Sequence, residues 1–258
     1  MKIIVLMKQV ANKDAVLRIA GDEKWINEAD VSHQTNESDG YALEEALRTV
    51  EAKGEGEVVV CSLGPQSAKT VIKDALARGA HRAIHIVVDD TKSMSAYQIA
   101  RAISDAVRDE AADLIFSGLQ SDDASFGQTG VILAELLEIP HATIVIEVDR
   151  ESLGDSVRVK RELESGWYQW FTYKTPALMT IQSGISQIRY ASLKGIMAAK
   201  SKEVREVTPS IEKFASAPKI EKVYIPLKTK QTQMLGNGDT KAGAVELVQK
   251  LRDEVRAF

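Results

Sequence analysis

Cysteine is nearly absent from the 258-residue sequence, which holds one, at position 61. A single thiol excludes an internal disulfide and a cysteine-based zinc site, and it is typical of a reducing cytoplasm. No run approaches the ~20 apolar residues of a membrane-spanning helix, and the opening apolar run is too short for a signal peptide. Basic residues number 33 against 37 acidic ones, so no positive field predicts nucleic-acid binding. We therefore expect a cytoplasmic protein that neither inserts into membranes nor binds nucleic acid.

The signatures of common catalytic sites are also missing. His81 and His85 are the one pair of histidines with a ligand-like spacing, but in a strand such residues lie about 13 Å apart. Ser62 belongs to no nucleophile elbow, and no Walker A or G-x-G-x-x-G motif occurs. Cys61 falls in a predicted buried strand, where a thiol is usually inert. The sequence makes no case for a self-contained enzyme or a metal site.

Short apolar runs alternate with longer amphipathic ones through the first half of the chain. Continuous apolar runs are typical of strands covered on both faces in a parallel sheet. These runs are Ile3–Met7, Val58–Cys61, Ala83–Val88, Leu114–Phe116 and Thr143–Val148. Between them apolar residues recur at helical spacing; the first helix is expected over Tyr41–Ala52, with Ser38 as N-cap and Gly54 as its end. The order predicts an α/β fold with a doubly wound sheet and right-handed crossovers.

From about residue 157 the pattern changes. Alternation over 157–163 and 168–173 predicts an antiparallel pair, and the apolar run Ala177–Ile181 predicts one more buried strand. Residues 189–238 are polar and contain several prolines, and helical spacing returns only over Thr240–Arg256. Because this tail has too few apolar residues for a core of its own, we expect an extended arm lying on its own domain or on a partner subunit.

The most distinctive loop spans residues 117–130 and leads into an apolar helix at 131–137. In an open parallel sheet, ligands bind beside the carboxyl end of such a strand. Gly127 and the final glycine allow close backbone approach, and the free N–H groups of the helix start suit an anion. A plain polar loop before a capped helix is the alternative. Asp122 and Asp123 would repel phosphate, so we expect them to face ribose hydroxyls, another chain or solvent.

Two further loops end at the same edge of the predicted sheet. They cover residues 8–10 and 62–65, and Asn36 precedes the first long helix. Together with the loop at 117–130 they could enclose an adenine nucleotide, with backbone groups reading the base and the helix start holding phosphate. Taken singly, each is equally an ordinary connection from strand to helix.

Five of the 14 aromatic residues fall within residues 167–173. Alternate side chains of a strand face opposite sides, so this stripe predicts core or a subunit interface. A nucleic-acid stacking platform would need accompanying basic charge, which the net charge of −4 does not supply.

Several segments together resemble the β subunit of electron transfer flavoproteins, and the resemblance covers essentially the whole chain. The final helix and KVYIP (222–226) are similar to the subgroup that serves trimethylamine-dehydrogenase-like partners. The other matching segments, in the family's order, are MKIIVLMKQV (1–10), SLGP (62–65), LARGAHRAIHI (76–86), GLQSDD and GQTG (118–130), VKREL (159–163), TPALMTI (175–181) and RYASLKGIMAAKSK (189–202).

The resemblance implies a Rossmann-like, mostly parallel, adenine-nucleotide-binding domain over 1–188 and an arm over 189–258 that wraps the partner α subunit. In common members the β subunit holds a structural AMP, and the redox-active FAD is held mainly by the α subunit at the interface. The AMP phosphate site matches the helix start at Gly127, Gln128 and Thr129, and Asp123 and Ser125 match cofactor-binding positions in the preceding loop. The positions that surround the rest of the nucleotide in the family match Leu6, Asn36 and Leu63.

The family also has a segment that docks into flavin dehydrogenases. It matches this chain at Tyr190, Leu193, Ile196 and Met197. Leu193 matches the anchor, an apolar knob for a pocket on the partner; a leucine of the local core is the alternative. The resemblance then implies a non-catalytic subunit of a carrier that passes electrons to an electron transfer flavoprotein–quinone oxidoreductase or a similar acceptor.

Two other readings stay open. Electron-bifurcating members hold a second, redox-active FAD in place of AMP, and their loop typically reads DGDTAQVGP. Here residues 122–130 read DDASFGQTG, which is closer to the AMP type. A stand-alone ATP- or AMP-binding regulatory protein is the third reading, and the tail with too little core argues against it.

Overall fold

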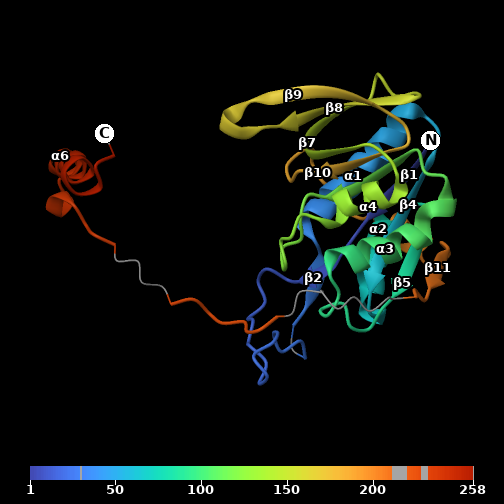
Figure 1. The fold of residues 1–258 in the computed structure, drawn as a ribbon, viewed down its shortest axis with the longest axis horizontal. Helices are drawn as coiled ribbons and strands as arrows, with labels where there is room; N and C mark the ends of the chain where they lie inside the picture. The colour runs from blue at the N-terminus through green and yellow to red at the C-terminus, as the bar shows by residue number, and fades with distance from the viewer. Residues whose placement is uncertain (30, 211–219, 228–231, 258) are drawn as a thin grey trace. The chain divides into compact units, whose positions relative to one another are not determined.

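The computed structural model describes residues 1–29, 31–210, 220–227 and 232–257 (Figure 1). The chain divides into two units, Met1–Glu221 and Lys222–Phe258. The second unit holds α6 (Thr240–Lys250), which continues as the π-helical stretch η5 (Leu251–Val255). A helix was predicted at this place. Part of the predicted arm, including Pro218, lies outside the described residues.

A nine-stranded sheet forms the centre of the first unit, in the order β11-β5-β4-β1-β6-β10-β7-β8-β9. The neighbours from β11 to β7 pair in parallel, and β8 and β9 extend that sheet as an antiparallel pair. The predicted doubly wound, mostly parallel sheet with an antiparallel pair is therefore confirmed. The strands are β1 (Lys2–Leu6), β4 (Glu57–Gly64), β5 (Arg82–Val87), β6 (Leu114–Gly118), β7 (His141–Asp149), β8 (Ser156–Glu162), β9 (Tyr168–Lys174), β10 (Ala177–Ile181) and β11 (Val204–Val207).

Helices cover both faces of this sheet (Figure 1). Successive side chains of β1 point to opposite faces, so Ile3 packs with Leu43 of α1 while Ile4 packs in the cluster that contains Ile103 of α3. Both isoleucines are fully buried, which explains why the parallel strands read as continuous apolar runs. One face carries α1 (Glu37–Lys53) and α2 (Lys69–Arg78), and the other carries α3 (Ala96–Val107) and α4 (Thr129–Leu137).

Helix α1 begins earlier than predicted. Its N-cap is Asn36 and not Ser38, and the Ser38 hydroxyl instead donates to the carbonyl of Gln120 at 2.8 Å. The predicted end is confirmed, because Gly54 has φ 78° and its N–H bonds back to the last turn.

Several short elements were not predicted. Strands β2 (Gln9–Ala11) and β3 (His33–Thr35) pair antiparallel, and α5 (Leu193–Ala199) packs on α2 before the chain enters β11. Residues 189–207 lie within the first unit. The 3₁₀ turns are η1 (Gln66–Ala68), η2 (Arg108–Glu110), η3 (Glu164–Gly166) and η4 (Gly236–Gly238). None of the helices in the described ranges has the length and apolarity to cross a bilayer.

Candidate nucleotide site and docking surface

The carboxyl ends of β1, β4 and β6 meet at one edge of the sheet, because neighbouring parallel strands end on the same side. Leu6, at the end of β1, pairs with Cys61 of β4, and Val5 pairs with Phe116 of β6. Leu63 lies one residue before the end of β4. The structure thus brings the three predicted loops to a common edge.

Asn36 holds the loop after β6 against the start of α1. Its side-chain amide donates to the carbonyl of Gln120 at 3.0 Å, and its side-chain oxygen accepts from the N–H of Asp122 at 2.8 Å. The residue is 1 % exposed. Because its polar atoms bond the loop, Asn36 contributes to the site by fixing the loop's shape.

Asp39 ties two of the loops together, and sequence reasoning missed it. Its carboxylate accepts from the N–H of Lys8 at 2.8 Å and from the N–H of Gly118 at 2.9 Å. Burial raises the pKa of Asp39 to about 7, although these hydrogen bonds act in the opposite direction. An acidic residue in the first turn of a helix is common, so the sequence carried no signal that this one is buried between strand ends.

The two loop aspartates have partners within the chain. Asp122 accepts from the N–H of Glu37 at 3.0 Å, and Asp123 pairs with the Lys8 ammonium at 2.6 Å. Burial alone would raise the pKa of Asp123, but the charge and hydrogen bond of Lys8 hold it below its usual value. The expectation that these carboxylates face ribose, another chain or solvent was therefore incomplete, because both also fasten the loop.

The start of α4 has the features of an anion cradle. Gln128, which precedes the helix, makes no side-chain capping bond, and Gly127 has φ 62°. A β-carbon on Gly130 would lie 2.8 Å from the Ser117 hydroxyl, so the backbone passes very close to β6. The Ser117 oxygen is buried and has no hydrogen-bond partner among the described residues. Free N–H donors and an unsatisfied hydroxyl fit a phosphate group.

The predicted phosphate residues occupy one continuous loop and helix start. Ser125, Gly127 and Gln128 are exposed, and Thr129 is the first residue of α4. Ser125 has φ 53°, and its hydroxyl donates to the carbonyl of Ser121 at 2.9 Å. Its side chain therefore shapes the loop, while backbone N–H groups remain the better phosphate donors.

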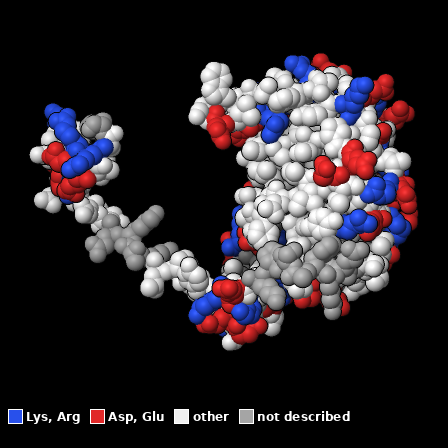
Figure 2. Space-filling model, viewed as in Figure 1, with Lys and Arg blue, Asp and Glu red and all other residues white. Residues whose placement is uncertain are grey.

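The Cys61 thiol and the His81/His85 pair can be checked in the structure. Burial raises the pKa of the Cys61 thiol to about 12, which keeps it protonated. His81 accepts from the N–H of Val58 at 3.0 Å, and His85 is fully buried. Within the described residues no three His, Cys, Asp or Glu side chains are grouped to hold a metal. On the face seen in Figure 2, cationic and anionic side chains are interspersed.

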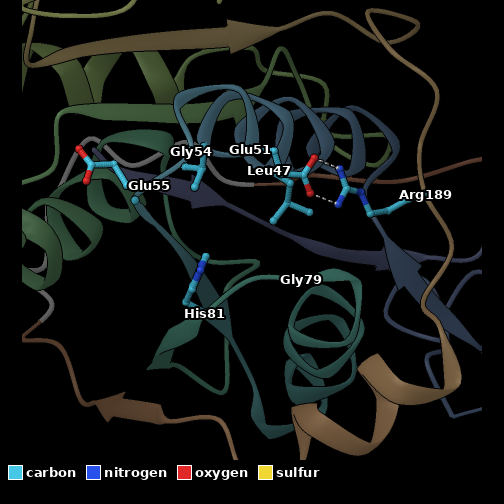
Figure 3. A pocket seen from close by; sticks show the side chains of 9 residues that line it. Leu47, Glu51, Gly54, Glu55, Gly79, His81 and Arg189 are labelled. Carbon is cyan, nitrogen blue, oxygen red and sulfur yellow. Dashed lines mark hydrogen bonds and ion pairs between the residues drawn. The ribbon is translucent and has the colours of Figure 1, made fainter.

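A separate pocket of about 400 Å³ lies beside the carboxyl end of α1 (Figure 3). Gly54 and Glu55 line it together with His81, and Glu51 faces Arg189 across one side. None of the predicted nucleotide residues lines this pocket. Arg189, which lines this pocket, immediately precedes the predicted docking segment that begins at Tyr190.

The predicted docking segment, residues 190–197, presents apolar side chains to the outside. Tyr190 is 95 % exposed and Leu193 77 %, so the alternative of Leu193 as a core residue is wrong. Ile196 and Met197 are also exposed. The four predicted docking residues thus lie together on α5 and the residues just before it.

The aromatic stripe occupies the edge strand β9 and the turn before it. Trp167 is 72 % exposed, and Tyr168 and Trp170 are exposed as well, so these three do not form core. Arg158 lies 4.6 Å from the centre of the Trp170 ring, a cation–π contact. An interface role for this hairpin stays a prediction.

A doubly wound, mostly parallel sheet with helices on both faces defines a Rossmann-like α/β protein. Comparison with known proteins narrows the class. Residues 24–212 match the model of the electron transfer flavoprotein domain. The chain is 32 % identical to the electron transfer flavoprotein subunit beta of Methylophilus methylotrophus, covering 95 % of this chain and 96 % of that protein.

Other relatives carry the same name. The subunit beta of Bradyrhizobium diazoefficiens is 34 % identical over 98 % of both chains. That of Mus musculus is 34 % identical over 80 % of this chain and 81 % of its own. The chain therefore belongs to the electron transfer flavoprotein family and is related to its β subunits, as the motifs predicted.

Proposed function

We propose that this chain is the non-catalytic β subunit of a cytoplasmic, heterodimeric electron carrier. The α subunit holds the FAD near the interface, and that flavin accepts electrons from dehydrogenases and passes them to a quinone oxidoreductase or a similar acceptor. The observation that carries the proposal is the family match over residues 24–212.

The carboxyl edge of the sheet binds AMP in this proposal. Backbone N–H groups of Gln128 and Thr129 hold the phosphate, and Gly127 lets the backbone approach it. Leu6 and Leu63 lie at the strand ends around the rest of the nucleotide. Because AMP binds only the folded state, it stabilises the fold.

The second unit contacts the α subunit in this proposal. Helix α6 and the stretch after it expose apolar side chains, and a helix of this kind is stable only when its apolar side is covered. The exposed residues are Val245, Leu247, Val248 and Val255.

Residues 190–197 dock into the electron-donating dehydrogenase. Leu193 is the anchor, because it is the most exposed aliphatic side chain of the four predicted docking residues and an exposed knob gains most from a partner's pocket. The donor to examine first is trimethylamine dehydrogenase, since the sequence resembles the subgroup that serves it.

The test uses the heterodimer assembled with its α subunit. Reduction of the bound FAD by trimethylamine dehydrogenase is followed by absorbance at increasing heterodimer concentration. Leu193→Ala is expected to raise KM about tenfold or more at unchanged kcat. Val16→Ala, which truncates another exposed aliphatic side chain, is the matched control and should leave KM unchanged. Equal KM values for Leu193→Ala and wild type would remove the anchor assignment.

A further inference from the structure

Arg189 immediately precedes the docking segment, and all three nitrogens of its guanidinium group donate hydrogen bonds. Its Nε donates to Glu44 at 2.9 Å, and its two terminal nitrogens reach both oxygens of Glu51 at 2.5 and 2.9 Å. Its own backbone N–H donates to Glu44 at 3.0 Å. Both carboxylates belong to α1 (Figure 3 shows the Glu51 pair). The chain entering the docking segment is therefore fixed to the longest helix of the fold.

The Glu44 carboxylate makes this contact stronger than a surface ion pair. Its side chain is 3 % exposed, and buried charged hydrogen bonds are screened little by solvent. Burial alone would raise the pKa of Glu44, but the bonds from Arg189 and Arg48 hold it below its usual value. The carboxylate is thus ionised at neutral pH and the contact is intact there.

The middle of the docking segment touches α2 directly. A β-carbon on Gly195 would collide with the carbonyl of Ala77, so only glycine lets α5 approach this closely. The Ser192 hydroxyl accepts from the N–H of Gly195 at 3.0 Å and caps α5.

The far end of the segment is fixed as well. The Lys202 ammonium donates to the carbonyls of Leu76 and Ala80 at 2.8 and 2.6 Å, which closes the carboxyl end of α2. The chain then pairs with β5 as β11. Residues 190–201 are held at both ends and in the middle, while the four predicted docking side chains stay exposed.

We propose that Arg189 is a positioning residue that holds the docking segment in its binding shape before the dehydrogenase arrives. The inference rests on the proposed function, because it presumes that residues 190–197 dock. Ordering an interface segment during binding lowers affinity. A segment ordered in advance by Arg189 avoids that loss, so the arginine raises affinity for the donor without touching it.

The test compares Arg189→Ala and Arg189→Lys in the assembled heterodimer. Arg189→Ala should raise KM for trimethylamine dehydrogenase about tenfold at unchanged kcat. A lysine reaches one carboxylate but cannot bridge two, so Arg189→Lys should recover part of the loss. Hydrogen exchange over residues 190–201 should quicken about tenfold in Arg189→Ala, because the segment opens more often.

Arg150→Ala is the matched control. Arg150 bonds the buried carboxylate of Glu45, also on α1, at 2.6 and 2.7 Å, but it lies outside the docking segment. Its loss should lower the melting temperature yet leave both KM and exchange over 190–201 unchanged.

The outcomes separate the two proposals. If Leu193→Ala raises KM and Arg189→Ala does not, the docking function stands and the positioning role is refuted. If trimethylamine dehydrogenase does not reduce the wild-type heterodimer, the proposed donor is refuted, and hydrogen exchange decides on Arg189. Exchange over 190–201 that is the same in Arg189→Ala and wild type would then overturn the inference.

Discussion

Replacing Asp39 by asparagine tests whether the pKa of this buried carboxyl group is raised. Asp39 joins two loops at the carboxyl edge of the sheet, where the candidate nucleotide site lies. Burial raises the pKa of Asp39 from 3.8 to about 7 in the folded protein. The folded state therefore keeps a proton that the unfolded state releases. The contribution of Asp39 to stability therefore falls as pH rises from about 4 to about 7, and it stays level above that.

The size of this change in the free energy of unfolding follows from how far the pKa of Asp39 is raised. About three pH units at about 1.4 kcal/mol each amount to about 4 kcal/mol by which the contribution of Asp39 falls across this window. An asparagine side chain does not ionise, so Asp39→Asn removes that dependence. The amide oxygen accepts from only one of the N–H groups of Lys8 and Gly118, and the other is left unpaired at a constant loss of about 1–3 kcal/mol.

Urea unfolding of the heterodimer at pH 5 and pH 8, at one protein concentration, measures the difference. This interval covers about two of the three pH units, so relative to wild type Asp39→Asn should gain about 3 kcal/mol across it. Asp105→Asn, an exposed carboxylate paired with Arg101, is the control and should show no comparable gain. Parallel stabilities of wild type and Asp39→Asn from pH 5 to pH 8 would refute the raised pKa.

Two glycine substitutions test the close backbone contacts. Gly130→Ala places a β-carbon 2.8 Å from the Ser117 hydroxyl and 3.0 Å from Cγ2 of Thr180, so α4 must shift. The amount of AMP that copurifies with the protein should then fall at least several-fold, as measured by chromatography of the released nucleotide. Gly154→Ala meets nothing within 4 Å and should keep its AMP; undiminished AMP in Gly130→Ala would contradict the cradle. Gly195→Ala forces α5 off α2 and should raise KM for the dehydrogenase several-fold, with AMP content unchanged. A KM equal to wild type would show that contact to be dispensable.

The sheet could be predicted because its strands are buried on both faces. Each parallel strand except β11 contains an apolar run, and the change to alternation at residue 157 marked the antiparallel pair that forms one edge. Strands β2 and β3 were missed because each has only three residues, too few to show the alternation of apolar and polar side chains that marks a strand. Strand β11, with the exposed Arg205 and Glu206, was missed because an edge strand need not be apolar.

The candidate site was predictable in position but not in detail. Its position after an apolar strand predicted that the loop at 117–130 lies at the carboxyl edge of the sheet, as the structure has it, whereas the bonds that shape the loop join residues far apart in sequence. Asn36 and Asp122 are one such pair. The contact of Arg189 with Glu44 spans 145 positions, and no local pattern marks which of the chain's many charged residues form it.

Nucleotide content tests the central claim most directly. The heterodimer is denatured, and the released nucleotides are separated and counted against protein. One FAD and one AMP per heterodimer are predicted, with the AMP lost when Gly130 is replaced. Two FAD and no AMP would contradict the account, because the β subunit would then hold a redox-active flavin where we place a structural nucleotide.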